Sequence, residues 1–410
     1  MTAALRHLRR GRRRTVLAGL AVFVPVFLLV VFLGMIGGME KEMFASLTGF
    51  DTGHFQIRRA ADRPSGGALP LVRDPAPLLA VVEGSTEVAW YTVRLDLPAL
   101  AAAGDRSLGV VVQGVRPADA AAESPFARAV TSGRYLEPGD EGVVVGRQLL
   151  DALGLSLGDE LVLLGAHPQG AAGVAVPRIV GVFDLPDPAL GRGLVHVDLG
   201  VAQRLVRSPA VTAVVGYVRG VEGPWDAPRI EEAVGRLRAQ LPEGYEVLDW
   251  AQLGPESLVF MRLMRPIVVG FMVAFFFLGG LVVLNTLYLS VLERTRELGI
   301  ILALGAPRRY VMRQVLLESG LLATGAAMVG AALGLGFVLV VEAVGGFPLP
   351  GAYEEVTALF GMQPHLRMRV TAAEVGMAAV AMVAVAVVAA WYPARRAAAL
   401  EPLEAMRHAD

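Results

Sequence analysis

Few residues of this chain have the types and spacing that chemistry requires. The segment Gly154-Leu155-Ser156-Leu157-Gly158 matches G-x-S-x-G, the turn that holds the nucleophilic serine of α/β-hydrolases. That turn follows a strand and precedes a helix, because this order exposes the serine hydroxyl. Here Leu149–Leu153 predicts a helix before the motif, and Glu160–Leu164 predicts a strand after it. The order is reversed, so we expect no serine hydrolase site.

Other chemistry-bearing residue types are also sparse. The chain has no cysteine, which excludes disulfides, thiolate nucleophiles and cysteine-based metal sites. His54, His167 and His196 stand alone, without metal-ligand spacing. Lys41 is the only lysine, and the residues before it do not complete the phosphate-binding motif G-x-x-x-x-G-K-[ST]. We therefore expect no metal, no cofactor and no ATP hydrolysis by the chain itself.

The composition indicates a membrane protein. Of the 410 residues, 54% are hydrophobic and 18% are charged, and the mean hydropathy is +0.54, which excludes a disordered chain and disfavours a soluble enzyme. The net charge of −1 favours no nucleic-acid partner. Four charge-free apolar stretches are long enough to cross a hydrocarbon core of about 30 Å: Thr15–Ile36, Pro266–Tyr288, Ser319–Val341 and Val375–Tyr392.

Two alternatives for these stretches are disfavoured. Buried helices of a soluble protein rarely stay apolar over about 18 residues or more. The first stretch follows several arginines, as a secretory signal peptide does, but its 22 apolar residues exceed the usual h-region and no Ala-x-Ala cleavage site follows. We therefore predict four transmembrane helices, the first of them an uncleaved anchor.

The arginines predict the orientation of the spans. The N-terminal flank, the segment 289–318 and the C-terminal tail together hold 14 Arg against six acidic residues, a net charge of +8, so the remainder carries −9. By the positive-inside rule, these segments and both termini face the cytoplasm. The predicted organisation is a basic N-terminus with span one (1–36), an outside domain (37–265), and a C-terminal part (266–410) whose outside loop is 342–374.

The outside domain reads as mixed α/β. Helical periodicity occurs at Pro75–Val82 and at Pro228–Leu241, where Ile230, Val234, Leu237 and Leu241 form an apolar stripe. Apolar runs rich in β-branched residues and bounded by turn residues predict seven strands: Glu87–Leu97, Leu108–Val115, Gly142–Val145, Glu160–Leu164, Arg178–Phe183, Leu194–Val197 and Val211–Val218.

The segment between spans two and three holds the most informative motif. Residues 290–309 read SVLERTRELGIILALGAPRR, a charged half followed by an apolar half. Glu293 and Arg296 are spaced to pair on one helix face. Gly305 occupies the position of a helix C′ residue, and Pro307 suits the start of the next helix. The pattern predicts a short amphipathic helix at the membrane, docked in a partner's groove or lying at the interface without a partner.

These residues resemble a known family. ERTRELGIILALGAPRRYVMRQVLLESGLL (293–322) is similar to the signature of FtsX/MacB-like ABC transporter permeases, also called type VII or mechanotransmission transporters. The ending Tyr392–Arg407 resembles the C-terminus of that family. Val143–Leu155 with Gly158-Asp159, and Arg178–Phe183, resemble its periplasmic core domain. The resemblance thus touches every part of the chain.

The resemblance implies a non-catalytic permease in the bacterial inner membrane with its large domain in the periplasm. A separate ABC ATP-binding subunit and a second permease copy or paralogue would be its partners. Gly38–Phe50 and Gln252–Arg265 would form stalk helices between the bilayer and the outside domain. The residues implied in coupling to the ATPase are Glu293, Arg294, Arg296, Glu297, Gly299, Leu304, Gly305 and Arg308. Gly299 would permit close approach of the partner.

The branch of the family follows from further motifs. Thr52–Ile57 and Gln113–Pro117 look most like the lipoprotein-releasing LolC and LolE subunits, which implies a lipoprotein or other hydrophobic substrate. Two alternatives stay open: export of a small molecule or peptide with an adaptor and an outer-membrane duct, and activation of a cell-wall hydrolase as in the FtsX branch. A membrane-anchored enzyme would instead lose its activity on Ser156→Ala.

Small and polar residues within the spans suggest helix packing. Gly330 and Gly334 form a G-x-x-x-G that lets a neighbouring helix approach closely, either at a dimer seam or by chance in an alanine-rich span. Asn285 is an amide within span two and would bond a neighbouring span or face water.

Overall fold

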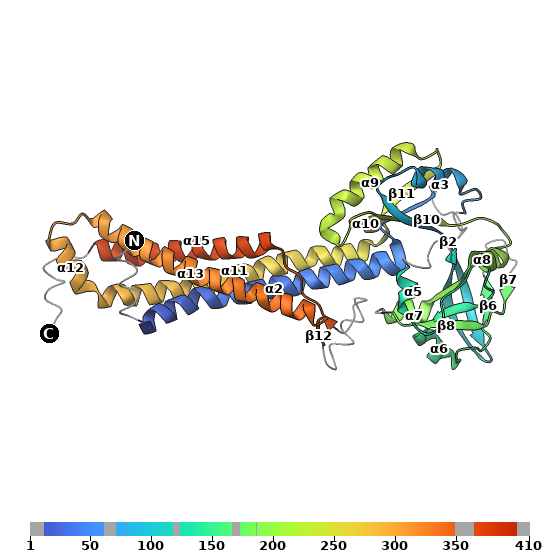
Figure 1. The fold of residues 1–410 in the computed structure, drawn as a ribbon, viewed down its shortest axis with the longest axis horizontal. Coiled ribbons are helices and arrows are strands. Elements are labelled where there is room, and N and C mark those ends of the chain that lie inside the picture. Colours follow the sequence, from blue (N-terminus) through green and yellow to red (C-terminus); the bar gives the residue numbers. More distant parts are fainter. Residues whose placement is uncertain are drawn as a thin grey trace. The chain divides into compact units, whose positions relative to one another are not determined.

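The structure is a computed structural model that describes residues 12–60, 71–117, 124–165, 173–185, 187–348 and 365–399. The chain divides into two compact units (Figure 1). The first comprises residues 1–39, 261–347 and 366–410, and the second comprises residues 40–260 and 348–365. Several positions used above lie outside the described residues: the first 11 residues of the N-terminal flank, His167, residues 400–407 of the C-terminal ending, and residues 349–364 of the loop 342–374.

The first unit consists of long helices. Four described helices are long and apolar enough to cross a membrane: α2 (Arg12–Leu47), α11 (Pro255–Glu293), α13 (Arg308–Ala343) and α15 (Ala372–Ala398). Each contains one predicted span. Two short strands, β12 (Phe347–Pro348) and β13 (His365–Leu366), pair between α13 and α15.

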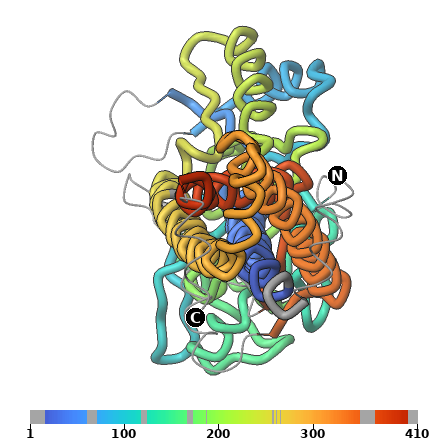
Figure 2. The backbone as a smooth tube through the Cα atoms, turned by 90° about the vertical axis from the view of Figure 1, so that its left-hand side faces the viewer, coloured from blue at the N-terminus to red at the C-terminus, as the bar shows by residue number. Residues whose placement is uncertain are grey.

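The four helices lie side by side (Figure 2) and share one apolar core. Their shared core includes Val26 of α2, Val283 of α11, Ala327 of α13 and Met382 of α15. The outward side chains are also apolar, for example Phe277, which is 64% exposed. A helix that is apolar on all sides requires an apolar solvent, so the exposed faces fit a bilayer.

The second unit is built on a sheet of eleven strands. The strand order is β11-β1-β10-β2-β3-β9-β5-β8-β4, with β6 and β7 attached beside β2. The strands are β1 (Phe55–Arg59), β2 (Val88–Ala103), β3 (Arg106–Val115), β4 (Val130–Gly133), β5 (Val143–Gly146), β6 (Val162–Gly165), β7 (Gly173–Ala175), β8 (Ile179–Phe183), β9 (Leu194–Asp198), β10 (Ala213–Val218) and β11 (Tyr245–Asp249). All seven predicted strands are present, and four more were not predicted.

Short helices accompany this sheet. They are η1 (Thr48–Thr52), α3 (Ala76–Glu83), α5 (Pro125–Ala129), α6 (Arg147–Leu153), α7 (Pro188–Gly193), α8 (Leu199–Val206), η2 (Pro224–Asp226), α9 (Ala227–Gln240) and α10 (Trp250–Leu253). In α9, Ile230, Val234 and Leu237 are buried as predicted, whereas Leu241 follows the helix and is half-buried. Together these elements confirm the predicted fold class of membrane helices with a mixed α/β domain.

Strand β2 continues past the predicted end at Leu97, through Pro98. On one side Pro98 lies opposite Val111 of β3. On the other side β10 pairs with β2 only up to Arg94, and β6 begins to pair at Ala99. Proline cannot donate to a strand ladder, and here it falls in the gap between two neighbours, so the strand tolerates it.

Candidate functional site

The segment between α11 and α13 forms a helical hairpin. Helix α11 ends at Glu293, and the short helix α12 runs from Thr295 to Ala303. At its end, the amide of Gly305 donates to Leu302 O (3.0 Å) and that of Ala306 donates to Ile301 O (3.2 Å). Gly305 has φ +91°, so this is a Schellman ending, and the predicted C′ position is confirmed.

The inner face of α12 packs within the chain. Leu298 and Gly299 are buried. Leu298 belongs to a cluster whose other buried members are Val291, Val311, Val315, Ala394 and Ala397. Gly299 is buried by packing within the chain, and its role in coupling stays a prediction.

The outer face of the hairpin is apolar and exposed. Leu304 is 84% exposed, Tyr310 56% and Ile300 44%. Ile301 is half-buried. The exposed charged residues of the hairpin are Glu293, Arg296, Glu297, Arg308 and Arg309. We call Ile300, Leu304 and Tyr310 the hairpin tip.

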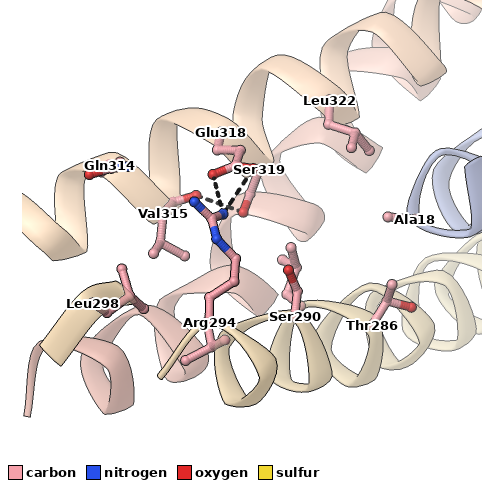
Figure 3. Close-up of a pocket in the computed structure, with 12 residues that line it drawn as sticks. Ala18, Thr286, Ser290, Arg294, Leu298, Gln314, Val315, Glu318, Ser319 and Leu322 are labelled. Carbon is pink, nitrogen blue, oxygen red and sulfur yellow. Dashed lines mark hydrogen bonds and ion pairs between the residues drawn. The ribbon is translucent and has the colours of Figure 1, made fainter. Parts of the chain in front are cut away.

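Arg294, between α11 and α12, forms ion pairs with residues of α12 and α13 (Figure 3). Its Nη1 donates to both carboxylate oxygens of Glu318 on α13, at 3.2 and 3.0 Å, and its Nε donates to Glu297 Oε2 at 3.3 Å. The side chains of Arg294 and Glu318 are about a fifth exposed, and each satisfies the other's buried charge. Arg294 thus makes ion pairs within the chain, and its predicted contact with a partner stays a prediction.

The helix break at Arg294 also corrects a predicted pairing geometry. Glu293 is the last residue of α11, whereas Arg296 lies in α12, so the two do not share one continuous helix face. Arg294 has φ −103° and ψ 11°, outside the helical region, which turns the chain into α12. The break frees Arg294 to reach α13.

A pocket of about 70 Å³ with both polar and apolar lining residues lies beside this ion pair (Figure 3). Its polar lining comes from α11 and α13 and comprises Thr286, Ser290, Arg294, Gln314, Glu318 and Ser319. A pocket of this size and polarity holds a few water molecules. Water there would hydrate the ion pair without separating it.

We expect the Arg294–Glu318 pair to stabilise the hairpin measurably. Arg294→Gln leaves the Glu318 carboxylate partly buried without its partner, which costs about 2 kcal/mol of unfolding free energy. A double-mutant cycle with Glu318→Gln, followed by thermal unfolding in detergent, should give a coupling energy of about 1–2 kcal/mol. The exposed pair Arg204–Glu141, at 62% and 82% exposure, is the matched control and should couple far less. Equal coupling in both pairs would contradict the assignment.

The residues predicted to pack helices, Gly330, Gly334 and Asn285, lie within the spans. A Cβ on Gly330 would lie 2.8 Å from Phe23 O, and one on Gly334 would lie 2.9 Å from Val30 Cβ. The close neighbour in the structure is therefore the chain's own α2, and the dimer seam stays a prediction. Asn285 is exposed on α11.

A second close contact between backbone segments, which was not predicted, lies between α2 and the segment before α15. The segment before α15 runs against glycines of α2, where Arg369 N donates to Gly34 O at 2.7 Å. A Cβ on Gly37 would lie 2.4 Å from Arg369 O, and one on Gly38 would lie 1.9 Å from Arg367 O. The glycine spacing at 34, 37 and 38 was the available signal, because such spacing leaves one helix face bare.

Ser156 lies in the second unit, in a turn that does not have the strand-to-helix order of a hydrolase nucleophile. It follows α6 and Gly154, whose φ is +71°, and its exposed backbone amide donates to Asp159 Oδ2 at 2.8 Å. The helix–turn–strand order is confirmed. Among the described residues, no group of His, Asp and Glu has the arrangement of a metal site.

His54 and His196 are buried in the second unit. Val218 N donates to His54 Nδ1 at 2.9 Å, which requires that nitrogen to be unprotonated. His196 lies 3.0 Å from both Tyr135 Oη and Gln113 Oε1. Desolvation by burial lowers the pKa of His54 to about 4 and that of His196 to about 3.

The lowered pKa values of these two histidines predict that the second unit loses stability in acid. The unfolded chain binds a proton at each near pH 6.5 and the folded chain does so only near pH 3–4, so stability falls as pH drops below 6.5. At pH 5 the loss is about 2 kcal/mol per histidine. Urea unfolding of the full chain in detergent, followed by Trp fluorescence between pH 7 and pH 5, measures it. His196→Gln should remove about half of the slope, and an unchanged slope would contradict the assignment.

Comparisons with known proteins match two family models to successive parts of the chain. The family model of the MacB-like periplasmic core domain matches residues 15–237, more than half of the chain. The family model of the FtsX-like permease C-terminal region matches residues 269–402. The chain is 23% identical to the lipoprotein-releasing system transmembrane protein LolC of Xylella fastidiosa, over 98% of this chain and 97% of LolC.

Two further similarities cover less of this chain. An uncharacterized ABC transporter permease of Mycobacterium bovis is 24% identical, over 81% of this chain and 84% of its own length. The periplasmic region of MacB from Actinobacillus actinomycetemcomitans aligns with a TM-score of 0.35 at 10% identity, over 52% of this chain and 96% of that structure. With family models matching both the membrane part and the sheet domain, this chain belongs to the FtsX/MacB-like family of ABC transporter permeases.

Proposed function

We propose that this permease couples ATP hydrolysis on a separate ABC ATP-binding subunit to movement of its outside domain, and that it releases lipoproteins from the inner membrane. The observation that carries the coupling role is the hairpin tip. Ile300, Leu304 and Tyr310 are exposed apolar side chains ringed by charged residues, the composition of a protein interface. The Arg294–Glu318 pair holds the tip in place, so a push on the tip acts on α11 and α13.

The similarity to LolC supports the cargo assignment, because it extends over nearly the whole of both chains. The MacB of Bdellovibrio bacteriovorus is 33% identical, but over only 32% of this chain and 17% of that protein. Removing an acyl chain from a bilayer costs about 0.8 kcal/mol per CH₂. Extraction of a lipoprotein therefore needs an energy source, which fits coupling to an ATPase.

The coupling role requires the hairpin tip and the sheet domain to lie on opposite sides of the membrane. We propose that the hairpin and both termini face the cytoplasm and that the sheet domain faces the periplasm, as the arginine distribution indicates. The chain has no cysteine, so Leu304→Cys and Ser156→Cys each introduce a single exposed thiol. In cells with a permeabilised outer membrane, an impermeant maleimide should label only Ser156→Cys. Labelling of both thiols from that side would overturn the proposed coupling.

Reconstitution tests the cargo. Vesicles containing the permease and its ATP-binding subunit should release an acylated lipoprotein on addition of ATP, and should leave a control lipid-anchored protein of unrelated sequence in place. The same lipoprotein lacking its acyl chains should not stimulate ATP turnover. ATP-dependent transport of a small apolar compound without lipoprotein release would favour an export role, and would overturn the lipoprotein assignment.

A further inference from the structure

The membrane helix α2 ends on the sheet of the second unit. After Leu47 the chain forms a π-turn, Thr48–Thr52, which closes at Gly53 with φ +66°. The last carbonyl groups of a helix lack partners within the helix and must find them elsewhere. Short π-helical turns are frequent at functional positions.

Side chains from three adjacent strands supply these partners. Arg94 Nη1 of β2 donates to Asp51 O at 2.6 Å, and Tyr217 Oη of β10 donates to Thr48 O at 3.1 Å. Gln56 Nε2 of β1 donates to Thr52 O at 3.0 Å. The strands β1, β10 and β2 are neighbours, and their register puts the three donors on one face of the sheet. We call this arrangement the α2 joint.

Arg94 is itself held firmly across two strands. Its side chain is buried, and its Nε donates to Asp96 Oδ2 at 2.9 Å. Thr212 of β10 donates its hydroxyl to Arg94 O at 2.9 Å and accepts from Asp96 N at 2.9 Å. A fixed guanidinium beside the carboxyl end of a helix is also favoured by the helix dipole.

Tyr217 is fixed in a similar way. Its ring stacks on Trp90 of β2, with centroids 4.1 Å apart and planes at 6°. Burial raises the pKa of Tyr217 to about 12, so its hydroxyl keeps the proton that it donates to Thr48 O.

Helix α11 begins at the same place. Trp250 N donates to His54 O at 3.1 Å, and the Trp250 ring packs edge-on against Phe44 of α2 at 5.0 Å. Gly254, just before α11, leaves room for Leu47, because a Cβ there would lie 2.9 Å from Leu47 Cδ2. The end of α2 and the segment before α11 are thus held to the sheet domain by hydrogen bonds and packing.

We infer that Arg94 and Tyr217 are the positioning residues through which a movement of α2 reaches the outside sheet. This inference rests on the proposed coupling function. Helices α2 and α11 each contribute residues to both units. A helix tied to the sheet by its terminal carbonyls transmits rotation as well as translation, whereas apolar contacts alone allow slip.

Hydrogen exchange on the full chain in nanodiscs tests the joint without any partner. The reporter is the amide of Gly53, which donates to Thr48 O at 3.0 Å. Its exchange should be about tenfold faster in Arg94→Met and about threefold faster in Tyr217→Phe, which keeps the ring stacked. Arg204→Gln, which breaks an exposed ion pair in the same unit, is the control and should change nothing there. Unchanged exchange in Tyr217→Phe and Arg94→Met would overturn the joint.

A distance measurement tests transmission in the complex with the ATP-binding subunit. Spin labels on Ser156→Cys and Val344→Cys, both exposed and one in each unit, should report a distance change on trapping with ATP and vanadate. In Tyr217→Phe and Arg94→Met that change should fall to less than half, while the distance without nucleotide stays the same. An undiminished change overturns this inference alone. No change in the unmutated complex overturns the proposed function and this inference with it.

Discussion

Leu304→Asp is expected to weaken binding of the ATP-binding subunit by about 30-fold or more while the permease stays folded. Leu304 is 84% exposed at the hairpin tip, so the substitution removes little packing within the chain. In a complex, the same position would bury an unpaired carboxylate against an apolar surface. Central apolar contacts of interfaces contribute at least about 2 kcal/mol each, which corresponds to a loss of affinity of roughly 30-fold or more.

The measurement is the affinity of the purified permease for its ATP-binding subunit in nanodiscs, together with the stimulated rate of ATP turnover. Val344→Asp is the matched control, because Val344 is 78% exposed just after the other end of α13. The control should bind normally. Equal affinity of Leu304→Asp and the unmutated permease would show that the hairpin tip does not carry the interface.

Gly38→Ala is expected to have the largest effect on stability. The added Cβ would lie 1.9 Å from Arg367 O and 2.6 Å from the carbon of that carbonyl. The obstruction is backbone, so no side-chain rotation relieves it, and either α2 or the segment before α15 must move. Overpacking of this kind costs about 3 kcal/mol. The contact from Arg369 N to Gly34 O, one turn away on α2, should weaken as well.

Thermal unfolding in detergent measures this loss. Gly336→Ala is the control, because nothing lies within 4 Å of a Cβ at that position of α13. There alanine favours the helix over glycine, so stability should rise by about 0.5–1 kcal/mol. A Gly38→Ala protein as stable as the control would contradict the close approach seen in the structure.

The membrane helices and most strands were predictable because their causes are local. A bilayer requires about 20 consecutive apolar residues, and this demand is visible in each window alone. Strands such as Val143–Gly146 are short apolar runs bounded by turn residues, so the pattern again suffices. Gly305 after α12 was predictable for the same reason, because a helix ending depends on a few neighbouring residues.

The partners of the functional side chains depended on the tertiary structure. Arg294 had three acidic residues nearby in sequence or on the next helix, and only the packing of α13 beside α11 selects Glu318. The same packing buries Gly299 and leaves Leu304 exposed, although both belong to one short motif. Packing also turns Gly330 toward α2. A sequence records which residues avoid water or suit a turn, whereas the contact between two elements distant in the chain is decided by how their surfaces fit.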